Sequence, residues 1–218
     1  MSLRYLSILL MTMFLAITVT PSTAVNVWAG DLLFLGDSLT VGANVTEWFG
    51  AENQGVVGES TVDIMDRLDD ALAGHPEVIV LMAGINDFGA GFGAKTVTAR
   101  YTRLLNKIRI RTPGARLVVL STLPVNNRKF GSRIDNREVE ELNRKLATIC
   151  PKYRAEFFDI VPYLAGNDGQ LRDEYTSDGV HLTPAGYQQW REAVSKLLTS
   201  PSGTVGSPKP KPGSPGHN

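Results

Sequence analysis

One serine occupies a position where a nucleophile would be exposed. Ser38 follows four consecutive apolar residues, 32–35, and then Gly36 and Asp37. The apolar run is typical of a short buried strand, and the glycine allows the chain to turn sharply at the end of that strand. We therefore expect Ser38 at the start of a helix, where unpaired backbone N–H groups attract negative charge. A serine there either acts as a nucleophile beside these donors or merely caps the helix, and this stretch alone allows both interpretations.

Only three histidines are available as a base for this serine. His217 lies near the C-terminus, and His75 precedes Pro76 at the amino end of a predicted strand, which is the wrong end for chemistry. His181 follows Asp178 by three residues in a predicted loop. A carboxylate that close can accept a hydrogen bond from Nδ1 and leave Nε2 facing the serine. This spacing favours His181 as the base, with Asp178 as the group that orients it.

Strands and helices alternate between the two ends of the chain. Continuous apolar runs predict the strands, and apolar side chains at helical spacing predict the helices. The expected strands are 31–35, 52–54, 78–82, 116–121 and 157–160, and the expected helices are 43–49, 61 or 63 to 72, 97–108, 139–149 and 184–198. Apolar strands separated by amphipathic helices are typical of a parallel sheet covered on both faces. We predict an α/β fold, a three-layer α/β/α sandwich around a doubly wound, five-stranded parallel sheet.

Such a sheet also predicts where a site should lie. Ligands of doubly wound sheets bind beyond the carboxyl ends of the strands, near the point where the strand order reverses. Four polar stretches follow predicted strands: Ser38 the first, 53–60 the second, 83–87 the third and 177–181 the fifth. Together they would place a nucleophile, backbone donors, an amide donor and an acid–base pair on one rim.

These four stretches resemble the sequence blocks of the SGNH, or GDSL, hydrolase superfamily. The resemblance implies a flavodoxin-like sandwich, with Ser38 as nucleophile, His181 as base and Asp178 as its partner. It also implies an oxyanion hole formed by the backbone N–H groups of Ser38 and Gly58 and the side-chain amide of Asn86. The matching residues stand in the family's order and spacing: Gly36-Asp37-Ser38-Leu39, Asn53-x-Gly55-x-x-Gly58, Gly84-x-Asn86-Asp87 and Asp178-x-x-His181.

Two further stretches, Leu123-Pro124-Val125-Asn126 and 175–182, look like the branch of the family that contains lysophospholipase-like enzymes and sugar O-acetylesterases. The resemblance implies a serine esterase that forms an acyl-enzyme intermediate. The sequence has no long insertion that could form a lid, which favours short acyl groups such as O-acetyl groups on carbohydrates. A lysophospholipase or thioesterase is the alternative, and a non-catalytic ligand-binding module on the same fold is another. We expect Asp37 to hold the turn beside the nucleophile, and Asp87 to brace its own loop.

The two ends of the chain are expected to lie outside a hydrolase domain that covers 30–199. Residues 1–24 combine Arg4 with an apolar run and small residues, which is typical of a signal peptide cleaved after Ala24 or Ala29. We therefore expect a secreted or periplasmic protein without stable membrane insertion after cleavage. Residues 200–218 are rich in proline, glycine and serine, and this composition predicts a disordered tail.

Composition argues against several other functions. The chain has 22 basic and 22 acidic residues, and this balance gives no electrostatic case for nucleic acid as a partner. Cys150 is the single cysteine, and no metal-ligand motif such as H-E-x-x-H occurs. We therefore predict no metal and no cofactor, and we expect Cys150 to be a buried, inert thiol. The sequence leaves the oligomeric state open and is compatible with a monomer.

Overall fold

Five parallel strands form the central sheet. The structure, a computed structural model, describes residues 31–131 and 133–199. The strands are β1 (Leu32–Gly36), β2 (Glu52–Gly55), β3 (Val78–Met82), β4 (Arg116–Leu120) and β5 (Ala155–Phe158). Their order in the sheet is β2-β1-β3-β4-β5, and every neighbouring pair runs parallel. The predicted five-stranded parallel sheet is therefore confirmed.

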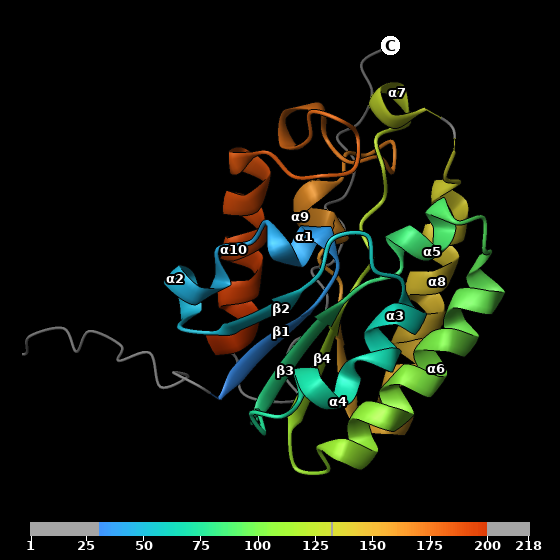
Figure 1. Ribbon diagram of the computed structural model, residues 1–218. Helices are drawn as coiled ribbons and strands as arrows, with labels where there is room; N and C mark the ends of the chain where they lie inside the picture. The colour runs from blue at the N-terminus through green and yellow to red at the C-terminus, as the bar shows by residue number, and fades with distance from the viewer. Residues whose placement is uncertain (1–30, 132, 200–218) are drawn as a thin grey trace, which may run out of the picture.

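Helices cover both faces of this sheet, as Figure 1 shows. One face carries α2 (Val45–Phe49), α9 (Val161–Leu164) and α10 (Pro184–Thr199). The other face carries α3 (Thr61–Asp66), α4 (Leu68–Ala71), α6 (Ala94–Arg111) and α8 (Asn136–Ile149). The connections contain the short helices α1 (Ser38–Val41), α5 (Ile85–Gly89) and α7 (Asn127–Phe130) and the 3₁₀ turns η1 (Cys150–Tyr153) and η2 (Asp173–Tyr175). These layers form the predicted α/β/α sandwich.

Alternation along the strands divides the apolar side chains between two cores. In β1, Leu33 and Leu35 belong to the core under α3, α6 and α8. Leu32 and Phe34 belong to the opposite core, where the ring of Phe34 lies 5.6 Å from that of Trp190 in α10. Successive side chains of a strand point to opposite faces, so a strand buried on both faces is apolar throughout.

The strand order reverses between β1 and β3, which lie side by side at the centre of the sheet. The chain leaves β1 toward β2 on one side and then crosses to β3 on the other. Gly36 ends β1 opposite Met82 of β3. A Cβ atom at Gly36 would lie 2.3 Å from the Met82 carbonyl oxygen and from Thr40 Oγ1, so a side chain has no room there. The loops that carry Ser38 and Asn86 therefore begin next to each other.

Five predicted elements are wrong in their boundaries. The helices expected over 97–108 and 139–149 both begin three residues earlier, at Ala94 and Asn136, and the first of them ends three residues later, at Arg111. The fifth strand was expected over 157–160 but ends at Phe158, because the Asp159 carboxylate accepts the Val161 N–H at 3.1 Å and starts the turn into α9. The segment expected as one helix up to residue 72 is two helices, because Arg67 leaves the helical conformation with φ −95° and ψ 9°. The helix expected over 43–49 begins at Val45, and a separate helix, α1, precedes it. The other strands start or end within one residue of the predicted positions.

The predicted signal peptide and the predicted tail lie outside the residues that the structure describes, so both stay predictions. Within 31–131 and 133–199, no helix combines the length and the apolar character needed to cross a membrane.

Candidate active site

Ser38 is the first residue of α1, directly after β1 and Asp37. The helix is capped by Asp37, whose carboxylate accepts the Leu39 N–H at 3.0 Å. The interpretation that Ser38 serves only as the cap is therefore wrong, and Asp37 holds the turn as expected. Burial raises the pKa of Asp37 to about 6, although the Leu39 N–H and the nearby His181 act to lower it.

His181 lies between Ser38 and Asp178 and is within hydrogen-bond distance of both. Its Nε2 is 3.0 Å from Ser38 Oγ, and its Nδ1 is 2.6 Å from Asp178 Oδ2. In the tautomer that suits both contacts, Nδ1–H donates to the carboxylate, and Nε2 accepts from the serine hydroxyl. The structure thus brings together three predicted site residues, two of which stand 143 positions apart in the chain. This arrangement can activate a serine hydroxyl for attack on an acyl carbon.

The loop that carries the acid–base pair does not follow β5 directly, because α9 and η2 come first. An antiparallel bridge between Thr176 and Leu182 closes it at its base. Inside the loop, Thr176 Oγ1 accepts the Gly179 N–H at 2.9 Å. Asp178 Oδ1 accepts the N–H groups of Val180 and His181 at 2.9 and 2.8 Å. The loop therefore has a fixed shape before any substrate binds.

These contacts also fix the charge of Asp178. Partial burial alone would raise the pKa of this carboxyl, but the hydrogen bonds from the His181 ring and from the Val180 and His181 N–H groups outweigh it. The pKa of Asp178 falls to about 2. Asp178 is therefore a carboxylate throughout the neutral range and can stabilise the imidazolium that forms at His181.

The segment that follows β4 holds the acid–base loop from outside. The Asn126 N–H donates to the Gly179 carbonyl oxygen at 2.7 Å, and the Lys129 ammonium donates to the Thr176 carbonyl oxygen at 2.6 Å. Asn126 is fully buried, and its amide also donates to Leu171 O at 2.8 Å and Asp173 Oδ1 at 2.7 Å. No role for Asn126 or Lys129 could be predicted from the sequence, because these contacts join segments about 50 residues apart.

Asn86 lies in the first turn of α5, which Gly84 begins with φ 106°. Its Nδ2 donates one hydrogen bond to the Glu59 carbonyl oxygen at 2.9 Å. An amide nitrogen carries two N–H groups, so a second donor is left for an incoming oxygen. Gly58 directly precedes Glu59 in an exposed turn with φ +80°. The structure therefore joins Asn86 to the turn that contains Gly58, and their assignment to an oxyanion hole stays a prediction.

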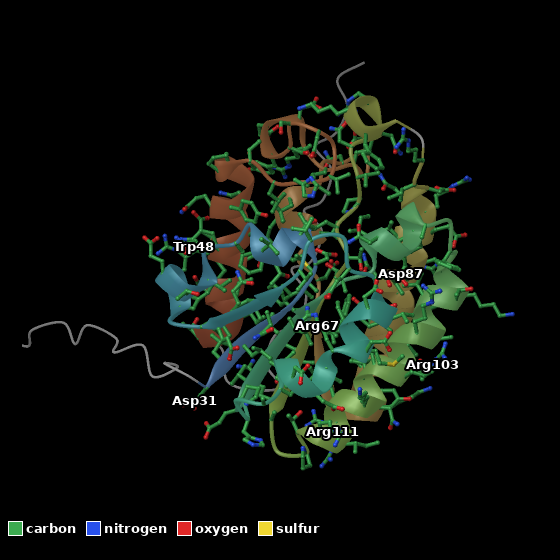
Figure 2. All side chains as sticks on the ribbon, viewed as in Figure 1. Asp31, Trp48, Arg67, Asp87, Arg103 and Arg111 are labelled. Atoms are coloured by element: carbon green, nitrogen blue, oxygen red, sulfur yellow. The ribbon has the colours of Figure 1, made fainter. Side chains whose placement is uncertain are left out.

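Asp87 was expected to brace only its own loop, but its contacts extend to two other helices. Its fully buried carboxylate accepts the Thr61 N–H at 2.9 Å and the Thr61 hydroxyl at 2.8 Å. It also pairs with Arg100 Nη1 at 2.7 Å (Asp87 is labelled in Figure 2). Buried carboxylates require several donors, and these donors come from α3 and α6. Asp87 therefore fixes α5, and with it Asn86, to two longer helices.

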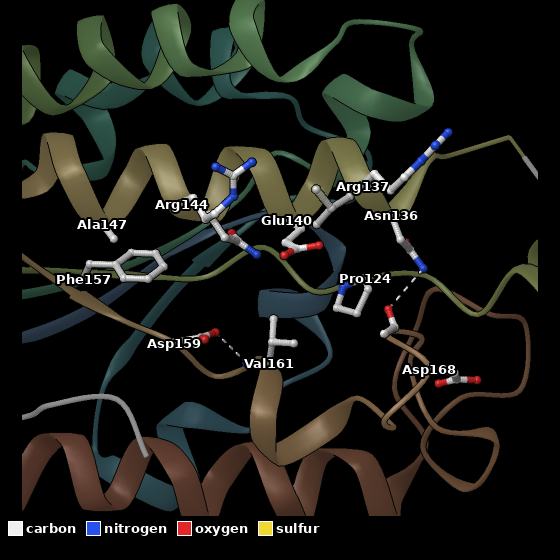
Figure 3. Close-up of a pocket in the computed structure, with 13 residues that line it drawn as sticks. Pro124, Asn136, Arg137, Glu140, Arg144, Ala147, Phe157, Asp159, Val161 and Asp168 are labelled. Atoms are coloured by element: carbon white, nitrogen blue, oxygen red, sulfur yellow. Dashed lines mark hydrogen bonds between the residues drawn. The ribbon is translucent and has the colours of Figure 1, made fainter. Parts of the chain in front are cut away.

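A cleft of about 580 Å³ lies away from these residues, between α8 and the segment that leads from β5 into α9 (Figure 3). None of the three residues Ser38, Asp178 and His181 lines it. Two of its lining residues, Asn136 and Asn143, have a structural role, because they hold the extended segment 122–125 in place. Asn143 Oδ1 accepts the Thr122 N–H at 2.9 Å, and its Nδ2 donates to the Thr122 carbonyl oxygen at 2.8 Å. Asn136 makes the same two hydrogen bonds with Val125, at the same distances.

Metal-ligating residues do not gather at this rim. Within the part of the chain that the structure describes, no group of three or more His, Cys, Asp or Glu side chains is placed to hold a metal ion. Cys150 is buried at the end of α8, and burial raises the pKa of its thiol to about 12. The thiol therefore stays protonated and unreactive in the folded protein.

A doubly wound α/β/α sandwich with a Ser–His–Asp set at its switch point has the architecture of an SGNH hydrolase. The sequence profile of the GDSL-like Lipase/Acylhydrolase family matches residues 34–189. The chain belongs to this family, and it is a hydrolase of ester bonds. The resemblance that the four sequence blocks indicated is thereby confirmed.

Relatives and solved structures agree with this assignment. Platelet-activating factor acetylhydrolase IB subunit alpha1 of Bos taurus is 32% identical over 195 residues, which cover 84% of this chain and 82% of the relative. A Streptococcus pneumonia structure, described as a candidate platelet activating factor, aligns with a TM-score of 0.72 and 29% identity over 77% of this chain and 83% of that chain. A variant of Axe2, an acetyl-xylooligosaccharide esterase from Geobacillus Stearmophilus, aligns with a TM-score of 0.65 over 82% of this chain and 98% of that chain. At 16% identity, the likeness to Axe2 is one of fold.

Proposed function

We propose that the protein is an exported serine esterase that removes short acyl groups, above all acetyl groups, from carbohydrate hydroxyls. The observation that carries this proposal is the hydrogen-bonded chain from Ser38 Oγ through His181 to Asp178, with distances of 3.0 and 2.6 Å. The acetyl preference is supported by the names of two similar proteins, an acetylhydrolase and an acetyl-xylooligosaccharide esterase. Export is supported by the signal peptide that the sequence predicts.

The reaction begins when Ser38 Oγ attacks the acyl carbon and gives its proton to His181 Nε2. Asp178 stays ionised and stabilises the resulting imidazolium. The carbonyl oxygen becomes negative, and the N–H groups of Ser38 and Gly58 and the free amide hydrogen of Asn86 donate to it. The carbon–oxygen ester bond then breaks, and the leaving alcohol takes the proton from His181. In the second half, His181 removes a proton from water, which attacks the acyl carbon. The bond between that carbon and Ser38 Oγ then breaks, His181 returns the proton to Ser38 Oγ, and the acid is released.

The openness of the acid–base pair supports a leaving group that extends beyond the site. The side chains of His181 and Asp178 are 51% and 52% exposed. A sugar chain attached to a small acyl group can therefore reach Ser38 while most of the chain stays in solvent. A long acyl chain would need apolar cover that this half-exposed pair does not supply.

A second candidate is a lipid ester, because large apolar side chains are exposed on the segments that carry or directly follow the predicted oxyanion donors. The identity of 32% to a platelet-activating factor acetylhydrolase also favours a lipid ester as the substrate. A non-catalytic binding module is disfavoured, because ligand binding alone does not need the Ser38–His181–Asp178 arrangement. The exposed apolar side chains on these segments are Val41 at 43%, Val56 at 40%, Val57 at 70% and Phe92 at 39%.

Hydrolysis of matched esters by the purified protein tests this proposal. We expect acetyl esters to be cleaved faster than octanoyl or palmitoyl esters, and acetylated xylan faster than lysophosphatidylcholine. Ser38→Ala should lower every rate about 10⁴-fold or more, because nucleophile and base act as one unit. A Ser38→Ala protein with a tenth of the activity would refute the role of Ser38, while a preference for palmitoyl esters would favour the lipid candidate.

A further inference from the structure

Arg67 joins the two ends of the turn that carries Gly58. Its Nε donates to both carboxylate oxygens of Glu59 at 2.7 Å, and its Nη2 lies 2.7 Å from Glu59 Oε2. The same Nη2 donates to the carbonyl oxygen of Gln54, at the end of β2, at 2.9 Å. The side chains of Arg67 and Glu59 are only 22% and 14% exposed. Paired, charge-assisted hydrogen bonds of this kind restrict geometry as well as adding energy.

Glu59 also connects this turn to the predicted amide donor. Its carbonyl oxygen accepts the Asn86 amide at 2.9 Å, while its carboxylate is held by Arg67. The bond to Glu59 occupies one of the two amide N–H groups of Asn86 and so directs the other. A displacement of Glu59 would therefore move Gly58, its neighbour in the chain, and would release Asn86.

The position of Arg67 in the chain suits this role. It lies at the break between α3 and α4, on the face of the sheet that α6 and α8 also cover (Arg67 is labelled in Figure 2). The start of α3 is fixed independently, because Thr61 is bonded to the buried carboxylate of Asp87. Residues 54–59 are thus anchored to β2 at one end and α3 at the other, and Arg67 spans the gap between them.

We propose that Arg67 is a positioning residue of the oxyanion hole. By holding Gln54 and Glu59 together, it sets the position of the Gly58 N–H and, through the Glu59 carbonyl, the direction of the Asn86 amide. The inference rests on the proposed esterase function. Oxyanion donors act within a narrow range of about 2.7–3.1 Å from the developing charge, and a misplacement of about 1 Å costs about 100-fold in rate.

The chain offers a matched control in the pair between Arg116 and Glu156. Arg116 Nε and Nη2 each lie 2.9 Å from the Glu156 carboxylate, and Nη2 also donates to the Leu197 carbonyl oxygen at 3.5 Å. The two side chains are 14% and 26% exposed, similar to the first pair. Arg116 stands at the start of β4, the opposite end of the sheet from the candidate site. Its removal therefore takes away a comparable ion pair without touching residues 54–59.

The test compares kcat, KM and thermal stability on an acetyl ester for Arg67→Met, Arg67→Lys, Arg116→Met and Asn86→Ala. We expect both methionine variants to lower the melting temperature by similar amounts. Arg67→Met should lose about 100-fold in kcat with KM and the pH profile nearly unchanged, whereas Arg116→Met should stay within about threefold of wild type. Arg67→Lys keeps the charge but loses the bidentate contact, so it should recover part of kcat, and it serves in place of a methionine variant that fails to fold.

A double variant, Arg67→Met with Asn86→Ala, tests how Arg67 acts. If Arg67 works through the oxyanion donors, the double variant should lose clearly less kcat than the product of the two single losses, because part of the Arg67 effect acts through Asn86 and part through Gly58. Fully multiplicative losses, or an Arg67→Met kcat equal to that of Arg116→Met, would overturn the proposal. Ser38→Ala separates this outcome from failure of the proposed function: an active wild type and an inactive Ser38→Ala leave the esterase function standing. A wild type without esterase activity overturns both.

Discussion

Replacing Gly179 with alanine tests whether the acid–base loop is held against the segment that follows β4. Gly179 has φ +92°, which an L-residue adopts only at a cost of about 1–2 kcal/mol. A Cβ atom there would lie 2.6 Å from the Asn126 carbonyl oxygen and 2.6 Å from Phe130 N and Cβ. Ordinary contacts between carbon atoms begin at about 3.5 Å, so the loop or the first turn of α7 must move by about 1 Å.

That movement reaches the base directly, because His181 is two residues farther along the same loop. Its Nε2 is 3.0 Å from Ser38 Oγ, and a shift of about 1 Å breaks this hydrogen bond or bends it out of line. Misplacement on this scale costs about 100-fold in rate. We therefore expect Gly179→Ala to lower kcat about 100-fold and to lower the free energy of unfolding by about 1–3 kcal/mol.

Gly169→Ala separates the two contributions. Gly169 also has a positive φ, +71°, but a Cβ atom there meets nothing within 4 Å. This control should lose stability from the backbone conformation while its kcat stays within about threefold of wild type. Steady-state kinetics on an acetyl ester and urea unfolding measure both quantities for each variant. The reasoning is refuted if Gly179→Ala keeps wild-type kcat, or if both variants lose kcat equally.

Three further substitutions address single groups. Asp178→Asn should lower kcat about 10⁴-fold, because an amide no longer stabilises the imidazolium or its tautomer; steady-state rates above a hundredth of wild type would contradict this. Asn86→Ala should lower kcat by about 10²–10³-fold with little change in KM, and a raised KM with kcat intact would assign Asn86 a different role. Burial raises the pKa of Asp37 from 3.8 to about 6, so the carboxyl contributes most to stability below pH 3.8, and this contribution is lost as pH rises through 6. Asp37→Asn keeps a side chain that can cap the helix but cannot ionise. The difference in melting temperature between this variant and wild type should therefore shift in favour of the variant from pH 4 to pH 8, by the equivalent of at most about 3 kcal/mol. An equal difference at both pH values would contradict the presence of a buried charge.

The sheet could be predicted where a strand is apolar throughout. β3 is an example, because Val78–Met82 is buried on both faces and its bounds match the predicted ones. The bounds predicted for β5 lie too far along the chain, because β5 is an edge strand in which Glu156 and Phe157 are only partly buried. Its apolar run continues through Ile160, past the point where Asp159 turns the chain into α9. Hydrophobicity alone does not mark such an end.

The Ser–His–Asp set could be proposed from sequence because histidines are few and the Asp178–His181 contact is local. Arg67 and Asn126 could not be found in this way. Each acts on the backbone of a distant segment, Gln54 O in one case and Gly179 O in the other. Every residue type has a backbone carbonyl oxygen, so the identity of the accepting residue does not reveal that such a contact exists. Contacts of this kind therefore cannot be predicted from the sequence.

The two asparagines of α8 make a helix serve as the partner of an extended segment. Asn136 and Asn143 are seven residues apart, a rise of about 10.5 Å in a helix. Their partners, Val125 and Thr122, are three residues apart, about 10 Å in an extended chain. The two spacings match, so both amides meet a full N–H and C=O pair at once, in antiparallel order. Deletion of one residue between the two contact points of either segment would prevent both pairs from forming at the same time. The lengths of the helix and of the strand-like segment are therefore coupled, and the position of Asn126 beneath the acid–base loop depends on that coupling.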